Sequence, residues 1–300
     1  MSLPVISCQQ LRFSRSTTEV LHGINFSVPK GGIVGLLGKN GAGKSTTIGV
    51  LMGYLAPDSG QCTVLGEPST AISASVRERI GLLHEGFIQY NFMTIEEIER
   101  FYAPFYKKWD SSVFWDLVNR MHIPKNRRIT RLSCGQRSQI TLGLILAQQA
   151  ELLILDDFSL GLDVGYRRLF LEFLRDYVNK TNATVLLTSH VVSELDEFLD
   201  HVIVIKEGRV LCDETRADFT AKFHQYILPI KGGALHLEAD GRDILNVEHD
   251  PDRASLYSTQ PIEVVRAWLM THHIAARDIE TLYEAPMSFE DTFVGITGRY

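Results

Sequence analysis

A glycine-rich run at residues 38–45 is the clearest candidate for chemistry in this sequence of 300 residues. It fits the pattern G-x-x-x-x-G-K-[ST], in which glycines let successive backbone N–H groups turn inward onto phosphate oxygens. A helix that begins at this point would add the positive end of its dipole. Lys44 would reach the β- and γ-phosphates of a nucleotide, and the Ser45 hydroxyl would hold Mg²⁺. The candidate nucleotide-binding residues are therefore Gly38, Lys39, Asn40, Gly41, Ala42, Gly43, Lys44, Ser45 and Thr46.

An acidic pair, Asp156-Asp157, supplies the second half of such a site. The pair directly follows the apolar run 152–155, and Mg²⁺ prefers carboxylate and water ligands. We expect Asp156 to be the carboxylate on the Mg²⁺ side and Asp157 to polarise an attacking water. By itself the pair would be an ordinary solvated end of a strand. Beside a phosphate-binding loop it predicts phosphoryl transfer to water.

Short apolar runs without alternation are the elements that must position these residues. Such runs suit strands that are buried on both faces of a sheet. They are residues 33–37, 152–155, 184–188 and 202–205. Helical stretches separate them, which is the βαβ pattern of a parallel sheet covered by helices. Residues 5–8 and 20–28 are β-rich as well and predict two further strands.

Residues from about 86 to 150 favour amphipathic helices instead. A capping box at residues 94–97 begins one of them. Seven aromatic residues then crowd into residues 101–115. This cluster predicts either the core of a helical subdomain or an exposed docking surface.

A second, smaller unit begins near residue 221. Short candidate strands lie at 226–228 and 234–237, and an apolar helix lies at about 262–270. The segment contains no phosphate or metal motif. We therefore expect a first domain at 1–220 and an accessory or regulatory domain at 221–300.

Composition and charge exclude several classes of protein. No stretch approaches the roughly 20 apolar residues of a membrane-spanning helix, and the first residues lack the features of a secretory signal. The four cysteines lie far apart without a C-x-x-C pair, which fits free thiols in a reducing compartment. Residues 1–220 carry a net charge of −1 and residues 221–300 one of −5. Neither part offers the basic face that binds nucleic acid, and the scattered histidines of the second part lack the spacing of a metal site.

Further motifs complete a resemblance to the ATP-binding subunits of ABC transporters. The family signature LSGGQ appears as LSCGQ at residues 132–136. Residues 161–163 are similar to its D-loop, and residues 188–190 resemble its switch-histidine motif. With the glycine-rich loop and the acid pair, in this order, the resemblance covers about residues 5–215. The sequence at residues 288–293 is similar to that of bacterial subfamilies that serve ABC-2-type exporters.

The resemblance implies an α/β fold with a P-loop NTPase (RecA-like) core, an antiparallel β subdomain and a helical signature subdomain, followed by a small C-terminal α+β accessory domain. It implies that ATP and Mg²⁺ bind between two ATPase chains, identical or different, that meet head to tail. Ser133 and the backbone of Gly135 in one chain would contact the γ-phosphate held by the other, with Gln136 as a further nucleotide-binding residue, and His190 would contact that phosphate too. It also implies a separate membrane permease, a position on the cytoplasmic face of the cell membrane, and no nucleic-acid partner.

Three positions depart from the family pattern. Asp157 stands where the family has Glu, and a carboxylate withdrawn by ~1 Å can lose about 100-fold in rate, which predicts slow hydrolysis. Glu85 aligns with the family's lid-loop glutamine and is expected to keep a contact with Mg²⁺. Arg15 falls where an aromatic residue stacks on adenine, and its planar guanidinium can stack on a base as well.

Two other classes of function compete with a transport ATPase. An ABC-type ATPase that acts on DNA or ribosomes would carry a long coiled coil or a second cassette, and this sequence has neither. A slow or non-hydrolysing nucleotide switch that regulates a membrane complex stays compatible with Asp157. The fold alone does not decide between a motor and a switch.

Overall fold

The computed structural model describes residues 3–84, 90–159, 162–189, 192–230 and 237–298. The chain divides into two compact units, Met1–Asp213 and Glu214–Tyr300, with separate buried clusters of apolar side chains. The division lies seven residues before the expected boundary at 220, so that helix α7 (Arg216–Lys222) belongs to the second unit. Among the helices in the described ranges, none has the length and apolar character needed to cross a membrane.

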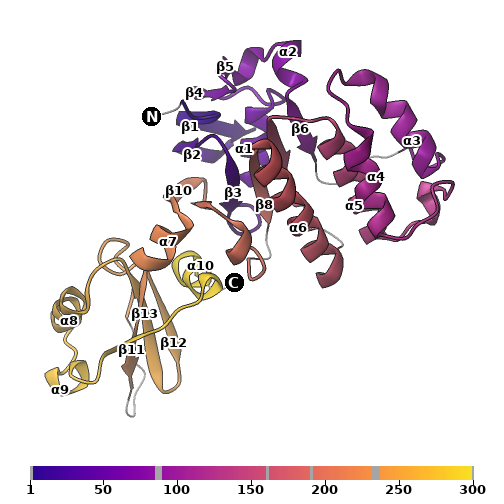
Figure 1. The fold of residues 1–300 in the computed structure, drawn as a ribbon. Coiled ribbons are helices and arrows are strands. Elements are labelled where there is room, and N and C mark those ends of the chain that lie inside the picture. Colours follow the sequence, from indigo (N-terminus) through magenta and orange to yellow (C-terminus); the bar gives the residue numbers. More distant parts are fainter. Residues whose placement is uncertain (1–2, 85–89, 160–161, 190–191, 231–236, 299–300) are drawn as a thin grey trace. The chain divides into compact units, whose positions relative to one another are not determined.

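A six-stranded sheet in the order β10-β9-β3-β8-β7-β6 forms the framework of the first unit (Figure 1). Its strands are β3 (Gly32–Leu37), β6 (Ile80–Leu83), β7 (Leu152–Leu155), β8 (Thr184–Ser189), β9 (His201–Lys206) and β10 (Arg209–Thr215). Neighbouring strands from β9 to β6 run parallel. Strands β7 and β8 are buried along their whole length. This confirms the parallel sheet predicted from the uninterrupted apolar runs.

Helices connect these strands at the sides of the sheet. Helix α1 (Lys44–Leu51) follows β3, α5 (Cys134–Ala147) precedes β7, and α6 (Val164–Thr181) joins β7 to β8. Figure 1 shows α6 running alongside the sheet, as a crossover between parallel strands requires. The short helix η4 (Asp196–Phe198) precedes β9. Because parallel strands end at the same edge, the loops that leave β3, β7 and β8 meet there.

An antiparallel sheet in the order β2-β1-β4-β5 is the second layer of this unit. Its strands are β1 (Ile6–Arg15), β2 (Thr18–Val28), β4 (Ser59–Val64) and β5 (Glu67–Pro68), and η1 (Ser69–Ala71) and α2 (Ala74–Arg77) follow them. Strand β1 extends beyond the predicted run 5–8. Its pairing with β2 changes register after Cys8. Gln10 has a φ of 49°, as in a β-bulge, which breaks the alternation that a sequence pattern can detect.

Helices fill the segment between β6 and β7. They are α3 (Ile95–Tyr102), η2 (Ala103–Phe105), α4 (Ser111–Arg120), η3 (Ile129–Arg131) and α5. The predicted capping box begins α3, where Glu97 N–H donates to Thr94 Oγ1 at 3.2 Å and Thr94 N–H donates to the Glu97 carboxylate at 2.8 Å. Each interpretation of the aromatic cluster applies to part of it, because Phe114 is fully buried whereas Phe105 is 63% exposed.

The second unit contains an antiparallel sheet in the order β12-β13-β11-β14. Its further elements are β11 (His224–Pro229), β12 (Asn246–Asp250), β13 (Arg253–Ser258), α8 (Ile262–Thr271), α9 (Ala276–Ile279), β14 (Tyr283–Ala285) and α10 (Phe289–Thr297). The structure has the expected strand at 226–228 within β11 and the expected helix at 262–270 as α8. Most of the candidate strand at 234–237 lies outside the described residues.

The Asp240 carboxylate links the turn before β12 to α8. Its Oδ1 accepts hydrogen bonds from the N–H groups of Arg242, Asp243 and Ile244 at 2.9 Å each. Its Oδ2 accepts one from Trp268 Nε1 at 2.8 Å. Desolvation raises the pKa of Asp240, but these hydrogen bonds outweigh it and keep the pKa below its ordinary value.

We predict that Asp240→Asn destabilises the second unit by about 1 kcal/mol at about pH 7, because an amide cannot accept hydrogen bonds on both sides. The pKa of Asp240 falls on folding, so its ionised form contributes stability above its ordinary pKa of about 4. That contribution is lost as the pH falls through the folded pKa. Urea unfolding followed by tryptophan fluorescence should therefore show a smaller difference from wild type at about pH 3.

The exposed Asp252 in the same unit provides a matched control. Asp252→Asn should leave the free energy of unfolding within about 0.5 kcal/mol of wild type. A difference between Asp240→Asn and wild type that is equally large at both pH values would contradict this account of the turn.

Candidate functional site

The loop between β3 and α1 is shaped around the Lys44 ammonium. Lys44 Nζ donates to the carbonyl oxygens of Gly38 and Lys39 at 2.7 and 3.0 Å, so the side chain folds back over its own loop. Gly43, the N-cap of α1, has a φ of 108°, which glycine adopts at little cost. Burial holds the pKa of Lys44 below its ordinary value, and the charges of Asp157 and Asp156 oppose that shift only in part. The two acids therefore offset some of the cost of burying the ammonium group.

Asp156 connects this loop to the parallel sheet. It directly follows β7 and is only 2% exposed. Its Oδ1 accepts hydrogen bonds from Ser45 Oγ at 3.2 Å and from Thr188 Oγ1 at 2.8 Å. Its Oδ2 is buried without a hydrogen-bond partner in the described part of the chain. The Ser45 hydroxyl and the Asp156 carboxylate therefore lie together, as the sequence predicted.

Asp157 follows Asp156, and the backbone leaves the extended conformation of β7 at this residue. Its φ is 43°, a left-handed conformation in which Asp is enriched. Its backbone N–H donates to Thr188 Oγ1 at 2.7 Å, and Ser159 Oγ donates to its Oδ1 at 3.5 Å. Thr188 thus contacts both acids, a role that its place in the motif 188–190 did not reveal.

A cavity of about 890 Å³ opens at this edge of the sheet. The predicted residues that line it are Arg15, Asn40, Gly41, Gly43, Lys44, Ser45, Thr46, Asp156 and Asp157. Gly38, Lys39 and Ala42 are not among its lining residues. The carbonyls of Gly38 and Lys39 hold Lys44, and Ala42 is buried within the loop. Sequence reasoning did not name the other lining residues as site residues, and these are Val20, Gly49, Tyr54, Leu55, His84 and Thr188. Tyr54 in particular stands in no recognisable motif.

The signature residues begin α5 and do not line this cavity. Ser133 is the N-cap, and its Oγ accepts from the Gln136 N–H at 3.2 Å. In return, Gln136 Oε1 accepts from the Ser133 N–H at 3.0 Å. This capping box leaves the next residue, Cys134, exposed at the start of the helix.

The ring of Tyr166 packs directly on Gly135. A Cβ at Gly135 would lie 2.4 Å from Tyr166 Cδ2. The buried Gln139 donates to the Tyr166 carbonyl at 2.8 Å, and the Tyr166 N–H donates to Asp163 Oδ1 at 2.9 Å. Tyr166 therefore fixes the signature helix against the start of α6. No sequence signal identified it, since the contact joins residues that are far apart in the chain.

Two predicted site residues, Glu85 and His190, lie outside the described residues, as does Gly161 of the D-loop segment. Their roles stay predictions. The described part of the D-loop segment includes Asp163, which caps α6.

Gly135→Ala is predicted to destabilise the protein by about 1–3 kcal/mol, because its methyl group would overlap the Tyr166 ring. In the double variant with Tyr166→Ala, the cost of Gly135→Ala should be smaller, and the double-mutant cycle measures that coupling. Gly165→Ala is the control, since its Cβ meets only Asp163 Oδ1 at an ordinary 3.5 Å. Thermal unfolding that finds the two alanine variants equally stable would show that this packing is wrong.

Comparison with known proteins agrees with this geometry. The ABC transporter family model matches residues 21–159. The sequence is 31% identical to the Nod factor export ATP-binding protein I of Rhizobium sp. (strain N33), over 100% of this chain and 99% of that protein. It is 30% identical to the linearmycin resistance ATP-binding protein LnrL of Bacillus subtilis (strain 168), over 73% of this chain and 71% of that protein.

A solved structure of the ATP-binding subunit of an ABC transporter superposes with a TM-score of 0.65 at 25% identity. The superposition covers 72% of this chain and 92% of that chain. The comparison of sequences and the comparison of structures thus point to the same family. The loop, the acids and the signature helix lie within the matching part of the chain. The chain therefore belongs to the ATP-binding subunits of ABC transporters.

Proposed function

We propose that this chain hydrolyses ATP at the carboxyl edge of its parallel sheet and thereby drives transport through a separate membrane permease. The observation that carries the proposal is the contact of 3.2 Å between Ser45 Oγ and Asp156 Oδ1. It brings the phosphate-binding loop and the strand-end acid into one site. Phosphoryl transfer depends on positioning and on neutralising charge. Here Lys44, the loop N–H groups and the start of α1 supply both.

The oxygen donors at this site suit Mg²⁺. A buried carboxylate oxygen without a partner is costly, and Asp156 Oδ2 is such an atom among the described residues. A hard cation with oxygen ligands would offset that cost. We assign Ser45 and Asp156 to Mg²⁺, with Glu85 added from the resemblance alone. When bound, Mg²⁺ neutralises charge on the phosphates.

Asp157 is proposed to polarise the attacking water. Its backbone is anchored on Thr188 at 2.7 Å, which fixes where the short side chain begins. The carboxylate reaches one methylene less far than that of a Glu, and a misplacement of ~1 Å can cost about 100-fold in rate. We therefore propose slow hydrolysis. Arg15, which lines the same cavity, would stack on the adenine.

Two chains arranged head to tail would complete the site. Ser133, Gly135 and Gln136 do not line the cavity around Lys44 in their own chain. A second chain is therefore needed if they contact the same nucleotide. The start of α5 would then present its backbone N–H groups and the positive end of its dipole to the γ-phosphate. His190 joins this contact by resemblance only.

An exposed aromatic surface, formed by Tyr90, Phe92, Phe101 and Phe105, is proposed to contact the permease. Its rings pack edge to face at centroid distances of 6.1, 4.9 and 5.4 Å. Phe92 is 68% and Phe105 63% exposed, and exposed apolar patches mark interaction surfaces. Binding there would place the chain on the cytoplasmic face of the cell membrane. The relative named for Nod factor export favours outward transport.

Asp157→Asn tests the proposed reaction most sharply. We expect ATP hydrolysis to fall at least about 100-fold, because an amide cannot polarise the water, while ATP affinity stays within about twofold. With Mg²⁺ and ATP the variant should also accumulate as a dimer in size-exclusion chromatography. Asp116→Asn is the control, since Asp116 pairs with Arg120 on the exposed side of α4.

The alternative function, a nucleotide switch, gives a different result. A turnover rate that is the same in wild type and in Asp157→Asn would remove Asp157 from the mechanism and favour the switch. Asp157→Glu separates two versions of the proposal. Turnover should rise if the site is ordinary and merely slowed by the missing methylene. It should fall if the surroundings fit only the shorter acid.

A further inference from the structure

A second cavity of about 540 Å³ lies at the opposite edge of the parallel sheet. Its lining includes residues that directly precede strands, namely Arg79 before β6, Glu151 before β7 and Ala183 before β8. The nucleotide site, by contrast, lies where the strands end. The volume falls in the range of about 300–1,000 Å³ that small-molecule sites occupy. Nothing in the proposed reaction uses this cavity.

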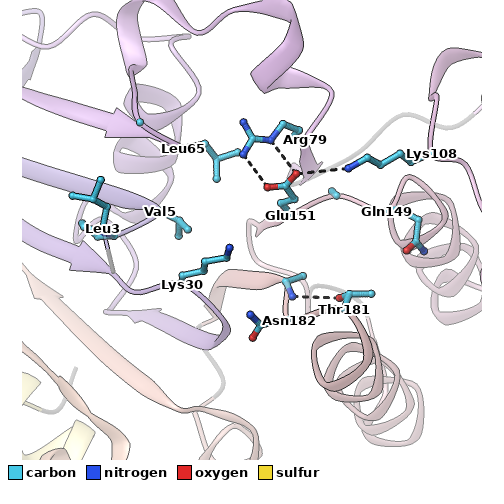
Figure 2. A pocket seen from close by; sticks show the side chains of 14 residues that line it. Leu3, Val5, Lys30, Leu65, Arg79, Lys108, Gln149, Glu151, Thr181 and Asn182 are labelled. Carbon is cyan, nitrogen blue, oxygen red and sulfur yellow. Dashed lines mark hydrogen bonds and ion pairs between the residues drawn. The ribbon is translucent and has the colours of Figure 1, made fainter. Parts of the chain in front are cut away.

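Three cations surround one carboxylate in this cavity, as Figure 2 shows. Arg79 binds Glu151 through two nitrogens, Nε at 3.1 Å and Nη2 at 2.8 Å. Lys108 Nζ lies 3.8 Å from Glu151 Oε1. The hydrogen bonds from Arg79 hold the pKa of Glu151 below its ordinary value, and the charges of Lys108 and Lys30 add to this effect.

The positive charge exceeds what Glu151 can neutralise. Arg79 satisfies both carboxylate oxygens, so Lys30 and Lys108 contribute charge without a carboxylate of their own in the cavity. The ends of α5 and α6 also lie here, and each adds about half a negative charge. Counted over the lining residues alone, an excess of roughly one positive charge is left, and the charge of Glu67, outside the lining, acts on Arg79. A cation would be repelled, and an anion would be attracted.

Apolar side chains form another part of the lining. Leu3, Val5 and Leu65 lie on one side of the cavity, and Lys30 points from that side toward Glu151 (Figure 2). Leu3 is 88% exposed, so an apolar ligand could cover surface that water now contacts. The amides of Gln149 and Asn182 add neutral polar groups to the lining.

We propose that this cavity binds a small organic anion whose single carboxylate or phosphate group lies between Lys30 and Lys108 and whose apolar body covers Leu3, Val5 and Leu65. Arg79 stays paired with Glu151, so that it neutralises this carboxylate and leaves the two lysines for the ligand. A charge-assisted contact with each lysine gives affinity, and the apolar side distinguishes this ligand from free phosphate. The same chemistry occurs in a free metabolite and in the headgroup and chain of an anionic lipid.

Hexyl phosphate is a suitable probe, with inorganic phosphate and hexanol as its two halves. Isothermal titration calorimetry should show saturable binding of hexyl phosphate to the full chain, and binding of either half at least about tenfold weaker. Lys30→Gln and Lys108→Gln should each weaken the binding by about three- to tenfold. Both side chains are exposed, so the variants should fold.

Lys107→Gln is the matched control. Lys107 is the neighbour of Lys108, is 84% exposed at its side chain and pairs with Glu78 outside the cavity. Its substitution should leave the affinity for hexyl phosphate unchanged. In NMR spectra of the wild type, the side-chain amide signals of Gln149 and Asn182 should shift when hexyl phosphate is added. The proposal is overturned if wild type shows no saturable binding, or if Lys30→Gln and Lys108→Gln bind as tightly as Lys107→Gln.

Vesicles that contain phosphatidic acid separate the two sources of the anion. Sedimentation with these vesicles that is lost in both lysine variants would assign the anion to a lipid. Binding of hexyl phosphate without such sedimentation would assign it to a free metabolite. Neither measurement requires ATP, so the outcome is independent of the proposed hydrolysis.

Discussion

The hydrogen bonds to the Asp156 carboxylate are the interaction on which the nucleotide site depends. They join β7 to Ser45 on α1 and to Thr188 on β8, three elements from distant parts of the chain. Burial of a carboxylate costs free energy unless it is paired or binds a cation. Here one oxygen is paired twice, and the other is buried without a partner in the described residues. In a purely structural acid nothing would offset that cost, whereas in a ligand of Mg²⁺ the bound cation would offset it.

The parallel sheet explains why charged residues gather at its two edges. Strands β7 and β8 are covered on both faces, and their central positions carry apolar side chains, while the polar residues of β8 stand at its two ends. Polar chemistry is then restricted to the loops at either end. At the carboxyl edge these loops carry Lys44 and Asp156, and at the amino edge they carry Arg79 and Glu151. The same strands therefore support two separate clusters of charge.

Local patterns predicted much of this structure from the sequence. The loop at 38–45 and the apolar runs depend on neighbouring residues, so their spacing was sufficient. Contacts between distant residues were not predictable: Thr188 on the two acids, Tyr166 on Gly135, and Arg79 with Glu151. Each involves a common residue type whose partner is fixed only by the fold. The length of β1 was missed because a bulge interrupts its alternation, and Glu85 and His190 stay predictions.

The most direct test of the central claim is the affinity for ATP with and without Mg²⁺, measured by calorimetry in wild type and in Asp156→Asn. If Asp156 is retained to hold Mg²⁺, the ion should tighten ATP binding at least about tenfold in wild type. Asp156→Asn should lose most of that gain, yet bind ATP without Mg²⁺ nearly as well as wild type, because Lys44 and the loop N–H groups are unchanged. An equal gain from Mg²⁺ in both proteins would contradict the claim.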